Sequence, residues 1–206
     1  MLADLLPVGF TGRYVRLEPL ATEHVSDLAA AAAIDRSTFD YTFVPDGRDE
    51  MRSYVDGLLV DRDRGLVVPF AQRRLDTGVL AGCTRYMEPR HWRRRAEPDE
   101  VEIGGTWLAG DAQRTALNTE AKLLLLTHAF EVWDVWRVAL CTDACNERSR
   151  RAIERLGASF EGILRSHRPV NTAGAGTTRP RDSAMFSITT AEWPSVRDRL
   201  RDRLAN

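Results

Sequence analysis

The sequence predicts an α/β (α+β) fold in which a mixed, mostly antiparallel central sheet is flanked by helices on both faces. Residues 67–84 contain two strand-like runs on either side of Asp76, Thr77 and Gly78, a typical hairpin turn. The β-branched run at 101–108 is followed by a loop, a helical pattern from 118 to about 133 and another strand at 138–142. That second order is typical of a right-handed parallel crossover, so an antiparallel first half continues into a parallel pair.

The N-terminal elements follow from local patterns. Residues 14–19 alternate between polar and apolar and stop at a proline, which predicts a first strand. Thr22 precedes apolar residues at helical spacing, so we expect it to cap a first helix. A second helix is predicted over about 51–59, after a stretch that is broken by Pro45 and Gly47.

The C-terminal elements also follow from local sequence patterns. Asn146 is predicted to cap a helix that stops at Gly157, with Ser149 on the stripe that faces the sheet. Strands at 159–168 and 182–189 enclose a loop rich in Gly, Ala and Thr that we expect to be mobile, and a last helix begins near Pro194.

Composition limits the class of protein. The chain of 206 residues suits a single domain spanning residues 1–206, with 43% hydrophobic and 29% charged residues. No apolar run reaches the roughly 20 residues of a membrane span, and the N-terminus lacks the pattern of a signal peptide, so we expect a soluble, cytoplasmic protein. A net charge of −1 gives no nucleic-acid signature, and we interpret the basic run 90–95 as a solvated loop. Cys83, Cys141 and Cys145 lack metal-ligand spacing, so no metal is expected.

The strand at 101–108 leads through a loop into the start of a helix. Unpaired N–H groups and the positive dipole end of such a helix bind anions, which predicts a phosphate site near residues 113–119. No G-x-G-x-x-G pattern follows a strand, which disfavours a dinucleotide-binding domain.

Several of these segments, in this order and spacing, resemble the GNAT acetyltransferase superfamily and its RimJ/RimL-like branch. The similarity is strong over residues 100–194 and weaker over Gly12–Leu20. The matching residues are Glu102–Trp107, Gln113–Lys122, His128–Glu131, Thr142–Arg150, Ala152–Ala158, Glu161, Gly162, Leu164, Arg165, Arg181–Ser183 and Glu192–Pro194.

The resemblance implies acetyl-CoA as co-substrate, with its pyrophosphate held by a loop of pattern Q/R-x-x-G-x-G/A. Alanine and asparagine replace the glycines of that pattern here, which removes positions where the backbone can most freely approach a phosphate. The residues that would hold the coenzyme are Trp107, Leu108, Ala109, Gln113, Arg114, Thr115, Ala116, Leu117, Asn118, Thr119, Asn146 and Ser149.

Amine acetylation needs a base for the ammonium and a proton donor for the departing thiolate. Ser149 matches the hydroxyl proposed as donor in the branch, although a small polar residue of a first helical turn is an equally good interpretation. The position of the branch's glutamate is Arg168, which cannot act as a base. Glu102 matches the base position of other members and His167 neighbours Arg168, so both stay open, with Glu102 slightly preferred.

The resulting prediction is an N-acetyltransferase that moves an acetyl group directly to a primary amine, at a protein or peptide N-terminus or on a small molecule. The alternative is a catalytically weak acyl-CoA-binding sensor or interaction module, suggested by the altered loop and by Arg168. A homodimer is compatible with either function, and neither a nucleic acid nor a membrane is an expected partner.

Overall fold

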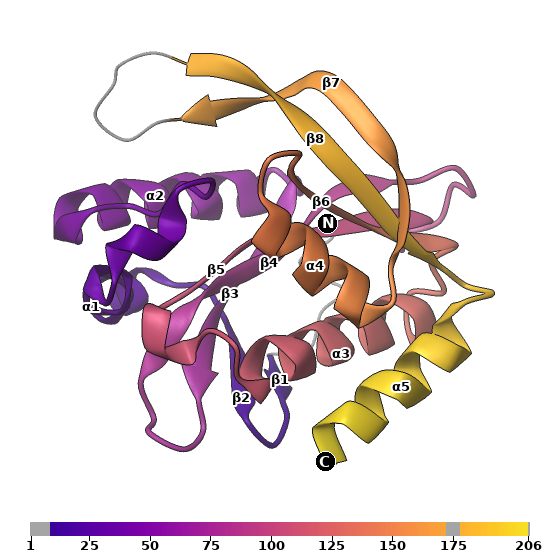
Figure 1. Ribbon diagram of the computed structural model, residues 1–206, viewed down its shortest axis with the longest axis horizontal. Coiled ribbons are helices and arrows are strands. Elements are labelled where there is room, and N and C mark those ends of the chain that lie inside the picture. The colour runs from indigo at the N-terminus through magenta and orange to yellow at the C-terminus, as the bar shows by residue number, and fades with distance from the viewer. Residues whose placement is uncertain (1–8, 172–177, 206) are drawn as a thin grey trace.

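A computed structural model of the chain describes residues 9–171 and 178–205. Within them, eight strands form one sheet in the order β1-β2-β3-β4-β5-β6-β8-β7 (Figure 1). The strands are β1 (Phe10–Thr11), β2 (Val15–Pro19), β3 (Val67–Arg74), β4 (Leu80–Arg90), β5 (Glu100–Leu108), β6 (Arg137–Asp143), β7 (Ser159–Asn171) and β8 (Thr178–Thr189). The expected mobile loop 171–180 lies largely outside the described residues, as do the first eight residues.

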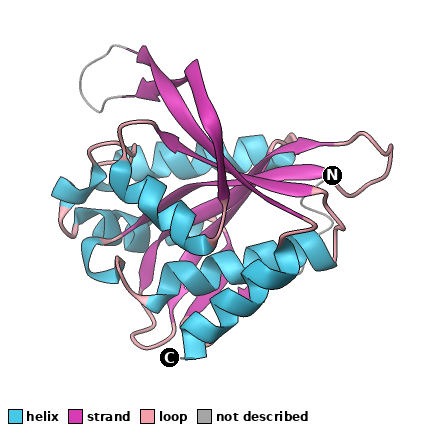
Figure 2. Cartoon of the chain, turned by 45° about the vertical axis from the view of Figure 1, so that its right-hand side comes forward, coloured by secondary structure: helices cyan, strands magenta, loops and turns pink. Residues whose placement is uncertain are grey.

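Helices cover both faces of the sheet, as predicted (Figure 2). α3 and α5 lie side by side along one face, and α1 packs on α2 at the other (Figure 1). The helices are α1 (Val25–Ala33), α2 (Gly47–Asp63), α3 (Ala116–Glu131), α4 (Glu147–Leu156) and α5 (Trp193–Ala205), with short 3₁₀ turns η2 (Thr22–His24), η3 (Arg36–Phe39) and η4 (Gly110–Ala112). In the described part of the chain, no helix is long and apolar enough to cross a membrane.

The sheet is antiparallel except where β5 meets β6, which confirms the predicted parallel crossover. β5 and β6 pair only between 100–102 and 137–139, although β5 continues to Leu108 and β6 to Asp143. The two strands therefore separate beyond Glu102 and leave an opening in the middle of the sheet.

A bulge interrupts β5 at this opening. Arg85 of β4 lies opposite Gly104 and Cys83 lies opposite Trp107, so β5 has one extra residue between these pairs. Gly105 has a φ of 56°, in the region that favours glycine. Strict strand alternation without a bulge predicts that Ile103 and Trp107 share a face. The extra residue reverses the alternation, so the two side chains do not share one.

Helix starts differ from the sequence predictions in three places. α2 begins at Gly47 rather than near Met51. α3 begins at Ala116 rather than at Asn118, because the Thr115 hydroxyl accepts the Leu117 N–H at 3.3 Å and caps the helix earlier. Thr22 does not cap α1, since a 3₁₀ turn intervenes and α1 begins only at Val25. The predicted Asn146 cap and the Gly157 stop, with φ 98°, are both confirmed.

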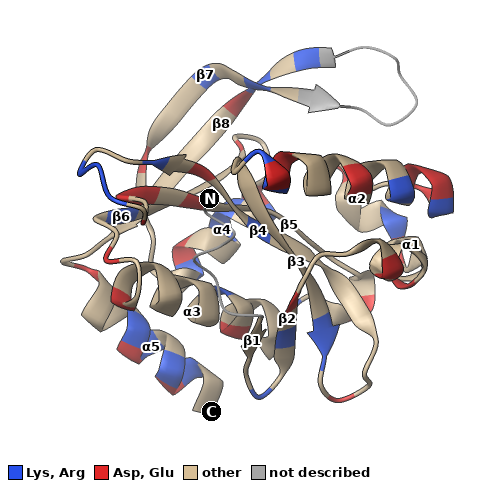
Figure 3. Cartoon of the chain, turned by 180° about the vertical axis from the view of Figure 1, so that it is seen from behind, with Lys and Arg blue, Asp and Glu red and all other residues tan. Residues whose placement is uncertain are grey.

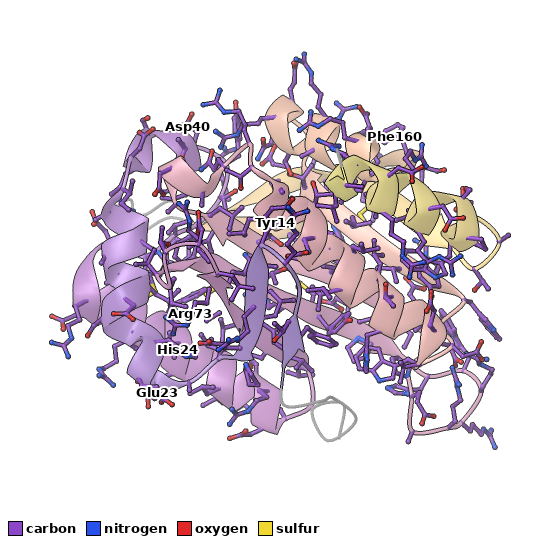
Figure 4. The ribbon with its side chains drawn as sticks, turned by 90° about the horizontal axis from the view of Figure 1, so that it is seen from below. Tyr14, Glu23, His24, Asp40, Arg73 and Phe160 are labelled. Atoms are coloured by element: carbon purple, nitrogen blue, oxygen red, sulfur yellow. The ribbon has the colours of Figure 1, made fainter. Side chains whose placement is uncertain are left out.

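Buried polar groups fasten α3 to its neighbours, although its sequence is apolar around most of its circumference. The Glu120 carboxylate accepts the backbone N–H groups of Arg13, Tyr14 and Val15 at 2.7, 2.6 and 2.9 Å. Tyr14 accordingly lies over α3 (Figure 4). Three charge-assisted hydrogen bonds from consecutive residues position this helix against the β1–β2 turn.

Ion pairs also connect surface segments. Arg93 forms ion pairs with Asp99, which is fully buried, and with Asp134. The basic run 90–95 is therefore bound to the rest of the structure, and the interpretation of it as a solvated loop is wrong. Glu18 joins Arg73 of β3 to His24 before α1, and these two residues lie close together (Figure 4). Elsewhere the surface mixes both signs of charge, most visibly along α2 and α5 (Figure 3).

Candidate active site

A cavity of about 1220 Å³ occupies the opening between β5 and β6. Its wall combines the diverging ends of these strands with the start of α3, one face of α4, the η3–α2 region and the β7–β8 hairpin. Segments from residue 36 to residue 203 therefore meet here. The volume is somewhat above the roughly 300–1,000 Å³ that is typical of small-molecule sites.

The start of α3 forms one end of this cavity. Thr115, Asn118 and Thr119 line it, and the Asn118 Oδ1 is buried without a hydrogen-bond partner in the described structure. The side-chain amide of Gln113 donates to the Leu108 carbonyl at 2.9 Å and so fixes the loop against the end of β5. The first-turn N–H groups of such a helix are donors that suit a phosphate, whereas the Asn118 Oδ1 is an acceptor and would need a separate donor.

The loss of both glycines does not strain this loop. The left-handed residue is Arg114, with φ 62°, whereas Ala116 and Asn118 both lie in α3 and keep negative φ angles. A side chain is sterically acceptable in helical backbone, so the two replacements introduce no backbone strain at the start of α3.

Ser149 lies in the first turn of α4 and lines the cavity, half-buried. Its backbone N–H donates to the Asn146 side-chain oxygen at 3.0 Å, so the capping bond uses no atom of the Ser149 side chain. The cap and the Ser149 hydroxyl are therefore separable by mutation.

Glu102 lies in the cavity wall but is not isolated. Both of its carboxylate oxygens accept from the Arg168 guanidinium, each at 2.8 Å. Burial alone lowers the pKa of Arg168, but the hydrogen bonds and the charge of Glu102 outweigh it and raise that pKa above its usual value. Each carboxylate oxygen keeps a second lone pair, so the pair can still accept a hydrogen bond from a third group.

His167 is placed differently from Glu102. It is half-buried, does not line the cavity, and its Nδ1 is buried without a partner in the described structure. Burial and the positive charge of Arg168 lower its pKa, which keeps the imidazole neutral at pH 7.

Sequence reasoning missed Lys122, one helical turn beyond Asn118. It lines the cavity at 4% exposure, and its amine donates to the hydroxyls of Thr84 at 3.0 Å and Thr106 at 2.7 Å. No carboxylate in the described part of the chain pairs with it, and burial lowers its pKa to about 7. Lys122 is the single lysine of a chain with 28 arginines, and this bias in the sequence could have singled it out.

The cavity brings together most of the predicted site residues. Those that line it are Glu102, Trp107, Leu108, Gln113, Arg114, Thr115, Asn118, Thr119, Asn146 and Ser149. The side chains of Ala109, Ala116 and Leu117 are outside its lining, as is His167. Among the described residues, no group of three or more metal-ligating side chains is placed to hold a metal ion.

This arrangement of strands, cavity and helix start is that of an acyl-CoA-dependent acetyltransferase, and the chain belongs to the GNAT acetyltransferase family. The model of the acetyltransferase (GNAT) domain matches residues 15–159. "Putative ribosomal N-acetyltransferase YdaF" of Bacillus subtilis (strain 168) is 31% identical over 156 residues, which cover 76% of this chain and 72% of that protein.

Solved structures agree with this family. A GCN5-related N-acetyltransferase from Brucella melitensis superimposes with a TM-score of 0.78 at 31% identity, covering 95% of this chain and 85% of that one. Mycobacterium smegmatis RimJ in complex with CoA-disulfide shares the fold, with a TM-score of 0.72 at 21% identity over 92% of this chain and 88% of that one. The relatives fit the RimJ/RimL-like branch to which the sequence pointed.

Proposed function

We propose that this protein transfers the acetyl group of acetyl-CoA directly to a primary amine within a ternary complex, and that the amine belongs to a protein or peptide N-terminus or to a small molecule. The observation that carries the proposal is the cavity between the diverging strands, which has an anion-binding helix start and also a buried carboxylate in its wall. YdaF, named as a ribosomal N-acetyltransferase, favours a protein acceptor. The cytoplasm is the compartment that fits such an acceptor.

The described residues fit acetyl-CoA. The backbone N–H groups at the start of α3 are suited to the phosphates, and the segment from Trp107 to Ala109 follows the edge of β5 that β6 leaves unpaired. Related RimJ holds a CoA-disulfide. When bound, the coenzyme supplies a thioester whose carbonyl carbon an amine can attack.

Residues of the chain would carry out the two proton transfers that the reaction needs. In this proposal Glu102 takes a proton from the acceptor ammonium, directly or through water, with His167 as the alternative base. Ser149 donates a proton to the departing thiolate from the first turn of α4. Unpaired N–H groups of β5 beyond the bulge are available to the carbonyl oxygen as charge develops on it.

Acetyl-CoA should stabilise the protein measurably. At about 100 times its dissociation constant a ligand adds about 2.7 kcal/mol, which for a chain of this size raises the melting temperature by roughly 5–11 °C. Thermal unfolding with and without millimolar acetyl-CoA measures this. Pantetheine, which lacks the phosphates, should give a much smaller shift, and equal shifts would contradict a phosphate site at α3.

Ser149→Ala should lower kcat by about 10²-fold or more if thiolate protonation limits the rate. The melting temperature should stay near that of the parent, because the capping bond uses only the backbone N–H of Ser149. Asn146→Ala is the matched control, since it removes the cap at a cost of about 1 kcal/mol. Turnover of Ser149→Ala within twofold of the parent would assign Ser149 a purely local structural role.

The Glu102–Arg168 ion pair favours a second candidate, an acyl-CoA-binding sensor with weak catalysis, because the pairing restricts the only buried carboxylate on this part of β5. Thiol release from acetyl-CoA in the presence of an amine panel separates the two functions. Release that depends on the amine supports the enzyme, whereas binding without release supports the sensor.

A further inference from the structure

Two arginines of the cavity wall combine partial burial with the absence of an ion-pair partner among the described residues. Arg85 on β4 and Arg181 on β8 are half-buried, and neither pairs with a carboxylate in the described part of the chain. Arg85 donates only to the Tyr54 hydroxyl at 3.4 Å, and Arg181 reaches only the Cys141 sulfur at 4.0 Å. The Nε of each is buried without a partner, so most of their N–H donors are unused.

None of the described carboxylates in the same wall forms an ion pair with Arg85 or Arg181. Glu102 is held by Arg168, and Asp61 pairs with Arg64 at 3.8 Å. Asp40 is exposed on the short segment after η3. The wall near Arg85 and Arg181 therefore carries uncompensated positive charge, which is costly in a half-buried site unless a ligand neutralises it.

Strand register places Arg85 and Arg181 near the Glu102–Arg168 pair, since Arg85 is opposite Gly104, two positions from Glu102. A Cβ added at Gly104 would lie 2.9 Å from the Glu102 Oε1, and one added at Gly105 would lie 2.4 Å from the Arg85 Cζ. The Glu102 and Arg85 head groups thus occupy space left by adjacent glycines of β5. Arg181 is directly opposite Arg168 in the β7–β8 ladder.

The phosphate end of the cavity has arginines of its own. Arg114 lies in the loop before α3, and Arg148 on α4 donates to the Gln113 side chain at 3.4 Å. Arg85 and Arg181 come from other strands, next to the residue expected to face the acceptor amine. Their position assigns them to the acceptor rather than to the coenzyme phosphates.

We propose that the preferred acceptor is a primary amine with a carboxylate close to it, as at an acidic protein N-terminus, and that Arg85 and Arg181 bind this carboxylate while the amine faces Glu102. The inference rests on the proposed acetyl transfer and adds the substrate class. The planar guanidinium binds carboxylates through paired N–H donors, which gives orientation as well as affinity.

The test compares two tetrapeptides with free α-amines that differ only at the second and third residues. One has aspartate and glutamate there, and its twin has asparagine and glutamine. We expect kcat/KM to be about tenfold or more higher for the acidic peptide at low salt, and the ratio to shrink as ionic strength rises. Free aspartate as a third acceptor distinguishes a small amino acid from a protein N-terminus as the natural source.

Arg85→Gln and Arg181→Gln should each reduce the acidic-to-neutral ratio of kcat/KM severalfold, with the KM for acetyl-CoA within about twofold of the parent. Arg201→Gln on α5, an exposed position outside the cavity, should leave the ratio unchanged. Equal rates for both peptides, or a preference that survives both cavity substitutions, would overturn the acceptor assignment alone. Absence of transfer to any amine despite binding of acetyl-CoA would overturn the proposed function together with it.

Discussion

Replacing Glu102 with glutamine is expected to lower acetyl transfer at pH 7 by about 10²-fold or more, with partial recovery at high pH. Glutamine keeps the shape of the side chain but cannot accept a proton. An α-amine with a pKa of about 8 is only roughly a tenth neutral at pH 7. The loss of a base therefore lowers the rate of transfer more at pH 7 than at higher pH. Initial rates between about pH 6.5 and 9.5 measure the effect, because the amine deprotonates unaided at the upper end.

The ion pair requires a control, since Glu102→Gln also leaves the Arg168 charge without its partner. Arg168→Gln breaks the same contact while keeping the carboxylate. A base role predicts that Arg168→Gln retains far more activity than Glu102→Gln. Equal losses would assign the pair to positioning, and a normal pH profile in Glu102→Gln together with an inactive His167→Gln would transfer the base role to His167.

Lys122→Met is expected to raise the free energy of unfolding at neutral pH by about 2–4 kcal/mol, or roughly 5–15 °C in melting temperature. The buried amine has a pKa of about 7, against about 10.5 in the unfolded chain. Between these values the unfolded state binds more protons, so the stability of the parent increases as the pH rises from 7 to 10.5. Methionine removes this cost, and Thr84 and Thr106 can still bond to each other at 2.9 Å.

The advantage of Lys122→Met should therefore be largest at or below pH 7 and disappear near pH 10.5, as urea unfolding across this range will show. Because the chain has one lysine, a carbon-13 label in lysine gives a single side-chain signal whose titration midpoint should be near 7. A midpoint above 10, or a Met variant that is less stable at pH 7, would contradict this. A residue that costs stability in a cavity wall is the usual mark of a functional constraint.

The sequence by itself determined the elements whose signals are local. The hairpin turn at Gly78, the cap at Asn146 and the stop at Gly157 depend on residues within one turn of each other, and all three are where the patterns predicted. The order of strand, loop and helix around residues 101–122 likewise follows from local patterns, and β5, η4 and α3 occur in that order.

The tertiary structure alone decided which side chains face each other in that cavity. Glu102 and Arg168 are 66 positions apart, and Lys122 meets Thr84 across 38 positions, so no local pattern could pair them. The bulge at Gly105 reversed the alternation of side chains along β5, which strand periodicity alone does not predict. Contacts of this kind depend on strand register and on how far β5 and β6 separate, and both are set by packing over the whole sheet rather than by the residues of either strand.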